Sequence, residues 1–334
     1  MLSSAPCLVT GATGFVGSAV ARALEAEGQS IRLLTRARSD RSNLNGLKAE
    51  IIEGDLRDPA SLERAIAGCG GLFHVAADYR LWVPDPAAML SANVDGTVAL
   101  MRAAQRAGVE RIVYCSSVAA LGQIGDGTPA DETTPNDPAK IVGIYKKSKY
   151  LAEQAVKKLV REESLPAVIV NPSTPVGPRD IKPTPTGKTI RDAAAGKIPA
   201  YIDTGLNIVH VDDVAQGHLL AYRHGRAGES YILGGEDFSL RDLLRLIADA
   251  AGQKPPRVSL PAAALWPVAI GCELAARAFG TDPLVTREML MMARKKMFFS
   301  SAKAQSELGY RARPARAAIE DAVAWFRAHG DIPA

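Results

Sequence analysis

Short apolar runs alternate with longer amphipathic segments through the first half of the chain, and this alternation constrains the fold more than any other feature. The expected strands are 7–10, 31–35, 49–52, 71–75, 111–115 and 167–170, and the expected helices are 18–27, 59–67, 89–107 and 145–162. Repeated strand–helix units with β-branched, buried strands predict an α/β protein with a doubly wound parallel sheet. Its ligands would lie at the carboxyl ends of the strands, where Thr10, Ser117 and Thr174 fall.

The second half indicates a smaller lobe beside this sheet. Residues 172–199 are rich in proline, glycine and charge, which is typical of an ordered excursion from a sheet. The strand 208–211 and the helix 214–222 are expected to return to the main layer. We therefore expect residues 1–174, with 206–223, to form a nucleotide-binding domain, and 175–205 with 224–334 to form a smaller C-terminal α/β substrate lobe.

A glycine loop, Gly11-Ala-Thr-Gly-Phe-Val-Gly17, joins the first expected strand to the first helix. Such a loop lets the backbone approach a pyrophosphate and directs a helix N-terminus at its charge. The loop alone is weak evidence, but Asp55 and Leu56 follow the third strand, where a carboxylate can meet an adenine amino group. Together these positions predict a Rossmann-type dinucleotide site.

The end of the second strand selects between the two nicotinamide dinucleotides. An acidic side chain there accepts hydrogen bonds from ribose hydroxyls, whereas an arginine pairs with the additional 2′-phosphate. This chain has Thr35-Arg36, with Arg38 and Arg41 nearby and no acid before Asp40. NADP(H) is therefore favoured, and NAD(H) stays open if these arginines belong only to a solvated loop.

Tyr145 and Lys149 lie four residues apart on an expected helix and so share a face. A nearby ammonium favours the phenolate, and a phenol that exchanges a proton is what carbonyl/alcohol interconversion requires. The pattern also occurs by chance on exposed helices. Its order after the glycine loop, Asn93-Val-Asp-Gly-Thr97 and Ser116-Ser117 supports the catalytic interpretation.

Charge and cysteine content exclude several classes of protein. The chain has 40 basic and 36 acidic residues, a near balance that argues against a nucleic-acid partner. Its four cysteines show no metal-ligand or paired spacing, and His74, His210 and His218 are scattered, so we expect a reduced, cytoplasmic protein without metal. No leader pattern precedes Cys7, and prolines and charges interrupt 258–279, which excludes a spanning helix there.

These motifs resemble those of the extended short-chain dehydrogenases/reductases, which include nucleotide-sugar epimerases, dihydroflavonol reductases and hydroxysteroid dehydrogenases. The resemblance covers essentially the whole chain and includes His74-Val-Ala-Ala77, Pro172 to Pro178 and His210-Val-Asp-Asp-Val214. More narrowly, the segments 77–82, 171–187 and 204–213 resemble the group named hopanoid-associated sugar epimerases.

The resemblance implies a role for each motif residue. Tyr145 would be the acid/base, Lys149 would lower its pKa and bind the nicotinamide ribose, and Ser117, with Ser116 as the alternative, would bind the substrate oxygen. The cofactor contacts would be Gly11, Thr13, Gly14, Phe15, Val16, Gly17, Arg36, Asp55, Leu56, Ala76, Ala77, Tyr145, Lys149, Pro172 and Ser173. The substrate would meet Asp78, Tyr79, Trp82, Thr174, Arg179 and Lys188.

Three functions are compatible with these expectations. The first is an NADP(H)-preferring oxidoreductase acting on a carbonyl or secondary alcohol, such as that of a hopanoid, another polycyclic lipid or its sugar-derived side chain. The second is a nucleotide-sugar epimerase with tightly bound NAD. Thr174 weighs against it, because sugar-nucleotide enzymes usually carry asparagine there. The third is a non-catalytic dinucleotide sensor, against which the retained Ser117, Tyr145 and Lys149 speak. A homodimer is expected in each case.

An apolar stripe at helical spacing runs through 260–279 and comprises Leu265, Val268, Ala269, Cys272, Ala276 and Phe279. Such a stripe must face either the protein or a lipid surface. It predicts a lid-like helix packed on the substrate lobe or, if the substrate resides in a membrane, a peripheral docking face that includes Trp266.

Overall fold

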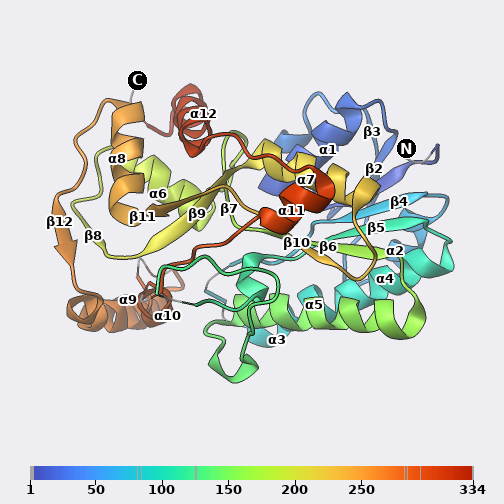
Figure 1. Ribbon diagram of the computed structural model, residues 1–334, viewed down its shortest axis with the longest axis horizontal. Coiled ribbons are helices and arrows are strands. Elements are labelled where there is room, and N and C mark those ends of the chain that lie inside the picture. The colour runs from blue at the N-terminus through green and yellow to red at the C-terminus, as the bar shows by residue number, and fades with distance from the viewer. Residues whose placement is uncertain are drawn as a thin grey trace.

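Seven parallel strands form the main sheet, in the order β10-β6-β5-β4-β1-β2-β3. The computed structural model describes residues 4–80, 82–83, 85–124, 126–281, 283, 285–293 and 295–332, and for Arg277 the backbone alone. The strands are β1 (Cys7–Thr10), β2 (Ile31–Thr35), β3 (Ala49–Glu53), β4 (Gly71–His74), β5 (Arg111–Cys115), β6 (Ala167–Pro172) and β10 (Ser230–Leu233). The expected doubly wound α/β fold is confirmed, and Figure 1 shows the sheet between two layers of helices.

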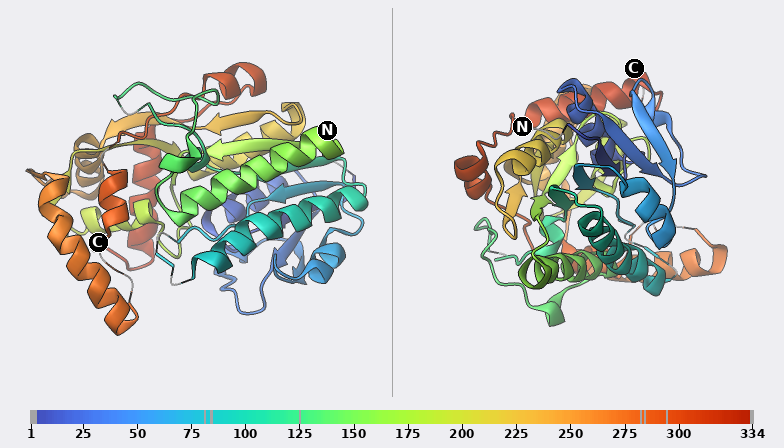
Figure 2. Two further views of the ribbon diagram at one scale, coloured as in Figure 1. Left: turned by 90° about the horizontal axis from the view of Figure 1, so that it is seen from below. Right: turned by 90° about the vertical axis from the view of Figure 1, so that its right-hand side faces the viewer.

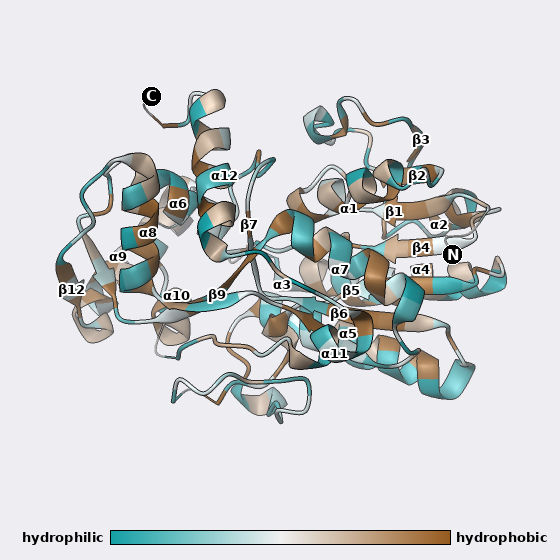
Figure 3. Ribbon diagram, turned by 45° about the horizontal axis from the view of Figure 1, so that its top comes forward, coloured by the Kyte–Doolittle hydropathy of each residue, from teal (hydrophilic) through white to brown (hydrophobic). Residues whose placement is uncertain are grey.

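Helices cover both faces of this sheet, as apolar strands buried on two sides require. One layer packs α1 (Phe15–Ala26), α7 (Val211–His224) and α11 (Ala302–Leu308) on the sheet. The other consists of α2 (Pro59–Ile66), α4 (Gly96–Arg106) and α5 (Ile144–Glu163). Figure 3 shows apolar residues concentrated on the strands and on the inward sides of these helices.

The helix expected over 89–107 is divided into three parts. α3 (Pro86–Leu90) begins after Asp85, whose carboxylate caps two backbone amides, and continues into a π-helical turn, Ser91–Asp95, before α4. A π-helical turn adds a residue to the helix and redirects a side chain. Here it places Asn93 against the loop after β4, where Asn93 Oδ1 accepts a hydrogen bond of 2.7 Å from the Asp78 backbone nitrogen.

The smaller lobe contains two short sheets and its own helical core, at the left of Figure 1. The first sheet has the order β11-β9-β7 and the second pairs β12 with β8. Their strands are β7 (Thr174–Val176), β8 (Ala200–Ile202), β9 (Gly205–His210), β11 (Glu236–Ser239) and β12 (Val258–Leu260). The helices are α6 (Pro185–Ala194), α8 (Leu240–Ala251), α9 (Trp266–Phe279), α10 (Arg287–Met292) and α12 (Ala315–Ala328).

Two strands lie in other sheets than expected. β9, which we expected in the main layer, pairs in parallel with β7 and antiparallel with β11 in the smaller lobe. β10, which we expected in the smaller lobe, pairs with β6 at the edge of the main sheet. Both are short, buried, apolar runs, so local sequence gives no information on their partners. α7 does lie against the main sheet, and the division into two domains otherwise stays a prediction.

The segment 260–279 forms a short 3-10 turn, Ala262–Leu265, followed by α9. Within the expected stripe, Ala269 and Ala276 are buried, but Val268 is 50% and Phe279 80% exposed. The helix is apolar around most of its circumference, so the spacing did not show which face packs. Among the described residues, no helix is long and apolar enough to cross a membrane.

Candidate active site

The carboxyl ends of β1, β4, β5 and β6 meet at one edge of the main sheet. β1 and β4 are neighbours there although they are distant in sequence, and the connections run outward in opposite directions from this pair. Such a switch point opens a crevice between neighbouring loops. The glycine loop after β1, Ala76 and Ala77 after β4, and Ser116 and Ser117 after β5 all lie along this edge.

Two glycines of the loop, Gly11 and Gly17, have no space for a side chain. Gly11 has φ of +74°, and a Cβ there would lie 2.7 Å from the backbone nitrogen of Ala76. A Cβ on Gly17 would lie 2.2 Å from the carbonyl oxygen of Gly11. Gly14 is the N-cap of α1, and no side chain caps this helix end. Uncapped backbone amides at a helix N-terminus, in a loop that admits close approach, fit a pyrophosphate.

The expected adenosine contacts lie beyond the glycine loop. Arg36 is exposed after β2 and makes no side-chain hydrogen bond or ion pair within the part of the chain that the structure describes. Asp55 is paired with Arg57, whose Nη2 lies 3.0 Å from its Oδ2, and the hydrogen bonds from Arg57 lower the pKa of Asp55 to about 2. Leu56 packs beside the α2–α4 layer. The guanidinium of Arg36 is thus accessible to a ligand.

Tyr145 lies in the first turn of α5 and faces Ser117 after β5. Burial raises the pKa of Tyr145 to about 12, although a hydrogen bond from Ser117 lowers it in part. Lys149 Nζ donates to the Cys115 carbonyl oxygen at 2.8 Å, and burial lowers the pKa of Lys149. The lowered phenol pKa that the four-residue spacing predicts is therefore not found, because burial outweighs the hydrogen bond from Ser117.

Ser116 and Ser117 differ in their hydrogen bonds. Ser116 is buried, and its Oγ donates to Glu153 Oε2 at 2.6 Å. Ser117 Oγ accepts from the Ala119 backbone nitrogen at 3.1 Å, and its proton, which points to Tyr145, can be donated to an oxygen bound beside that phenol. Ser117, rather than Ser116, thus has the hydroxyl suited to a substrate oxygen.

Glu153 organises the ends of β5 and β6, and the sequence reasoning missed it. Besides Ser116, its carboxylate accepts from Asn171 Nδ2 at 2.8 Å and from Lys157 Nζ at 2.8 Å. Asn171 Nδ2 also donates to the Ser117 carbonyl oxygen at 3.0 Å. The signal was present, since Glu153 follows Lys149 by four residues and therefore lies on the same face of α5.

A second buried polar chain links β1, β4 and the π-helical turn. His74 Nδ1 lies 2.8 Å from Thr10 Oγ1, and His74 Nε2 lies 2.9 Å from Thr97 Oγ1. Burial lowers the pKa of His74 to about 3, so the ring stays neutral. Asn93 Nδ2 donates to Ser148 Oγ at 2.9 Å, which connects this region to α5. These buried hydrogen bonds hold the loops that flank the crevice.

The expected substrate residues differ in their surroundings. Asp78 is paired with Arg80, and Arg179 is paired with Asp212. Tyr79 is partly exposed near Asp180 and Tyr145, and Trp82 lies further along the same loop. Thr174 begins β7, whereas Lys188 is exposed on α6. Next to Thr174, Pro172 ends β6 and the Ser173 hydroxyl has no partner among the described residues.

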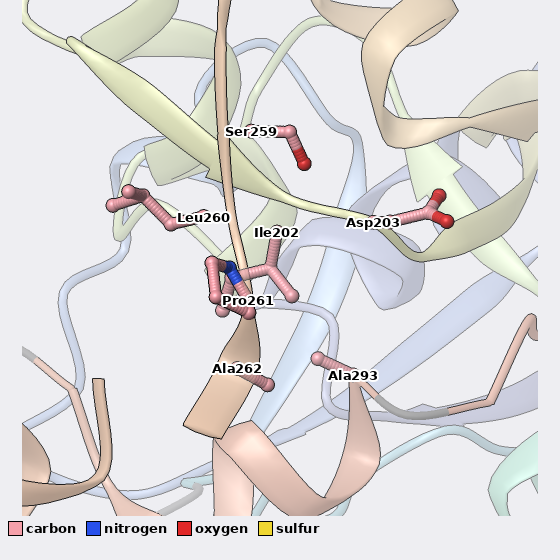
Figure 4. Close-up of a pocket in the computed structure, with 7 residues that line it drawn as sticks. All are labelled: Ile202, Asp203, Ser259, Leu260, Pro261, Ala262 and Ala293. Atoms are coloured by element: carbon pink, nitrogen blue, oxygen red, sulfur yellow. The ribbon is translucent and has the colours of Figure 1, made fainter. Parts of the chain in front are cut away.

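One cavity of about 340 Å³ lies away from all these residues. Figure 4 shows its lining side chains, from β8, β12, the 3-10 turn before α9 and the end of α10: Ile202, Asp203, Ser259, Leu260, Pro261, Ala262 and Ala293. Asp203 and Ser259 are its polar lining side chains, and none of the motif residues expected to bind the cofactor or transfer a proton lines it. Among the described residues, no group of His, Cys, Asp and Glu could hold a metal ion.

Comparisons with known proteins agree with this geometry. Residues 7–234 match the model of the NAD dependent epimerase/dehydratase family. A putative dihydroflavonol 4-reductase from Synechocystis sp. is 43% identical, over 99% of this chain and 97% of the relative. Sterol demethylase protein B from Methylococcus capsulatus is 35% identical, over 97% of this chain and 99% of the relative.

A solved structure, that of gox2253, is similar at 63% identity with a TM-score of 0.89, and the match covers 98% of this chain and 99% of that chain. The sheet order, the glycine loop and these matches lead to one conclusion. The chain belongs to the NAD-dependent epimerase/dehydratase family of extended short-chain dehydrogenases/reductases, and is an NAD(P)-dependent oxidoreductase or epimerase.

Proposed function

We propose that this protein is an NADP(H)-preferring oxidoreductase that interconverts a carbonyl and a secondary alcohol. The observation that carries the proposal is the position of Ser117 and Tyr145, whose side chains meet at the carboxyl edge of the sheet, with Lys149 one turn along α5. The glycine loop, Pro172 and Ser173 lie along the same edge, and these residues would hold the dinucleotide there. Bound nicotinamide supplies or accepts a hydride at its C4.

Tyr145 provides the proton. Because its pKa is about 12, the phenol is protonated at neutral pH, which is the form that reduction needs. Its proton passes to the substrate carbonyl oxygen as the carbonyl carbon gains hydride. Ser117 donates a hydrogen bond to the same oxygen. Lys149, held by the Cys115 carbonyl, then stabilises the resulting phenolate with its positive charge.

Arg36 supports the preference for NADP(H). Its guanidinium is exposed at the end of β2 and forms no ion pair with a described carboxylate, although Asp55 and Asp78 lie near enough to attract it, so it can form a charge-assisted pair with a 2′-phosphate. Arg38 is also exposed two residues later, whereas Arg41 is 2.5 Å from Glu53. An acidic side chain, the usual partner of the ribose hydroxyls in NAD, does not occur until Asp40.

The names of two relatives guide the choice of substrate. One is a putative dihydroflavonol 4-reductase and the other is sterol demethylase protein B, and both names refer to fused-ring compounds. We therefore infer a polycyclic substrate, such as a hopanoid or its sugar-derived side chain. The proposal includes a homodimer in the cytoplasm, with peripheral membrane contact through α9, whose Leu274 and Phe279 side chains are exposed.

An epimerase with tightly bound NAD is the second candidate, since the matched family model includes epimerases. It would oxidise and re-reduce one carbon without net redox change. Anaerobic denaturation of the purified protein distinguishes the two, because an epimerase should release stoichiometric NAD. A non-catalytic dinucleotide sensor is the third, and it predicts binding of NADP(H) without turnover of any carbonyl.

The direct test compares Tyr145→Phe with the unaltered protein. Reduction of a panel of aldehydes and polycyclic ketones by NADPH should fall ~10²-fold or more, because only the transferable proton is removed. The dissociation constant of NADPH should stay unchanged. Tyr150→Phe, on the following turn of α5, is the matched control and should keep full activity. Normal turnover by Tyr145→Phe would refute the assigned chemistry.

A further inference from the structure

A second cavity lies between the loop after β4 and the helices α9 and α10. It encloses about 290 Å³, and its lining residues are Trp82, Trp266, Glu273, Thr286, Arg287, Glu288 and Met291. α9 and α10 lie side by side at the end of the smaller lobe in Figure 1, and Figure 2 shows α9 extending outward from it. The cavity is thus bounded on one side by a loop of the nucleotide-binding half and on the other by the smaller lobe.

Large apolar side chains form much of this cavity. Two of the three tryptophans of the chain line it, and they come from segments far apart in sequence. Trp266 and Met291 are each 39% exposed, so their apolar surfaces remain partly in contact with water. Indole rings offer broad, flat apolar faces, and methionine adapts to irregular shapes. These properties suit the flat or elongated apolar body of a ligand.

The charges of the cavity disfavour an anionic ligand. Arg287 is the cation among its described lining residues, and Glu273 already binds it through Nε at 2.9 Å and Nη2 at 2.8 Å. Glu288 adds a second carboxylate to the wall. A nucleoside diphosphate needs unpaired cations or clustered amide donors, whereas here Glu273 holds Arg287, and Lys146, outside the lining, faces the Glu288 carboxylate. An uncharged ligand has no such requirement.

Residues on both walls of the cavity lie next to segments that adjoin Tyr145. The carboxylate of Glu288 packs on Gly143, where a Cβ would lie 2.0 Å from Glu288 Oε1. Gly143 is the N-cap of α5, two residues before Tyr145. On the other wall, Trp82 belongs to the loop that contains Tyr79, which is close enough to influence the pKa of Tyr145. A ligand seated here could extend its reactive end to the phenol.

We propose that this cavity binds the uncharged, apolar body of the carbonyl substrate, between the indoles of Trp82 and Trp266, while the reacting carbonyl lies at Tyr145. The inference rests on the proposed reductase function and names its substrate class: neutral polycyclic or long-chain ketones and aldehydes, in place of nucleotide sugars. Trp82 was an expected substrate residue, but Trp266, Met291 and Glu288 were not.

Tryptophan fluorescence tests this inference without depending on turnover. In a Trp325→Phe protein, the remaining tryptophans both report on the cavity. Progesterone or 2-decanone, added to the complex with NADP⁺, which cannot reduce them, should change the emission saturably, and UDP-glucose should not. The double variant Trp82→Phe/Trp266→Phe retains only Trp325, on α12, and should show no response. Adding Trp82→Ala to the Trp325→Phe protein should weaken ketone binding about tenfold while Trp266 still reports it.

The possible outcomes test ligand binding in the cavity separately from the proposed reductase reaction. A saturable response to UDP-glucose alone, or no response to any of the three compounds, would overturn the inference. Unchanged NADPH affinity and circular dichroism must accompany the weakened ketone binding of the Trp82→Ala protein, which excludes loss of the fold as its cause. Tyr145→Phe should bind the ketone as the unaltered protein does. Ketone binding in the cavity without reduction of any carbonyl would refute the proposed function and leave the cavity's assignment standing.

Discussion

The two sides of the crevice are built differently. On the nucleotide side, buried polar groups have fixed partners: His74 lies between two threonines, and Glu153 accepts hydrogen bonds from three side chains. On the substrate side, Trp266 and Met291 are partly exposed and surround a cavity. Satisfied buried networks are rigid, whereas loosely covered apolar surfaces adapt. The first side suits a dinucleotide held in one position, and the second suits the apolar substrate body that we propose.

Two helical glycines provide the strongest test of this comparison. A Cβ on Gly17 would lie 2.2 Å from the Gly11 carbonyl oxygen, whereas a Cβ on Gly271, in α9, would meet nothing within 4 Å. Gly17→Ala should therefore displace the glycine loop and weaken NADPH binding ~10- to 100-fold, as overpacking of 1–3 kcal/mol implies. Gly271→Ala should instead stabilise the fold by up to ~1 kcal/mol, since alanine is the better helix former. Titration with NADPH and thermal unfolding measure both effects, and equal effects at the two sites would contradict the comparison.

Under the proposed function, cofactor preference should depend on one side chain of the nucleotide side, Arg36. Arg36→Asp replaces a charge-assisted pair with repulsion, which should weaken NADPH binding ~10- to 100-fold, because such a hydrogen bond contributes ~1.5–3 kcal/mol. NADH binding should be unchanged or improved. Arg64→Asp, on the exposed surface of α2, controls for the change in net charge. Equal losses for both cofactors would mean that Arg36 holds its loop and not the phosphate.

The same contrast explains what the sequence could predict. The glycine loop, Ser117 and the pair Tyr145/Lys149 depend on short spacings at the ends of elements, and local pattern is enough to locate them. The partners of β9 and β10 depend on contacts between distant segments, which a buried four-residue run such as Ser230–Leu233 does not encode. The shared cavity was not predicted for the same reason: Trp82 was expected at the substrate and Trp266 on a docking face, and only the packing of the lobe brings the two together.

The boundaries of helices and the pKa values of site residues were harder to predict than the helices and strands themselves. The π-helical turn at Ser91–Asp95 follows no simple periodicity, although it decides where the Asn93 side chain lies. The pKa of Tyr145 depends on burial, and the four-residue spacing to Lys149 contains no information about burial. The sequence thus identified the groups that carry the proposed chemistry, but their environment became known only from the three-dimensional structure.

Glu153 should tune the site without touching the substrate. Glu153→Gln removes the charge that raises the pKa of Lys149 and leaves donors of Ser116 and Asn171 poorly matched. We expect kcat to fall about tenfold, KM to change little, and the unfolding free energy to fall by ~1–3 kcal/mol. Since the lost carboxylate favoured the ammonium, Lys149 should lose its proton at a lower pH, and the alkaline limb of the pH–rate profile should move downward.

Lys157→Gln is the matched control for Glu153, because it removes the outer partner and keeps the carboxylate. Activity and the pH profile should then remain close to those of the unaltered protein. If Glu153→Gln lowered stability but left the pH profile in place, the residue would be structural only.

The smallest effects on stability are expected on the exposed face of α9. Leu274 and Phe279 are 60% and 80% exposed, so Leu274→Glu/Phe279→Glu should change the unfolding free energy by ~0.5 kcal/mol or less. If α9 contacts a membrane, the same variant should lose cosedimentation with phosphatidylcholine/phosphatidylglycerol vesicles, since two apolar anchors become anionic. Ala269→Glu is the contrasting variant, because Ala269 is buried and a carboxylate there should destabilise the lobe. If the unaltered protein did not bind vesicles, α9 would line the cavity without contacting a membrane. If the Leu274→Glu/Phe279→Glu variant were strongly destabilised, the outer face of α9 would be covered rather than exposed.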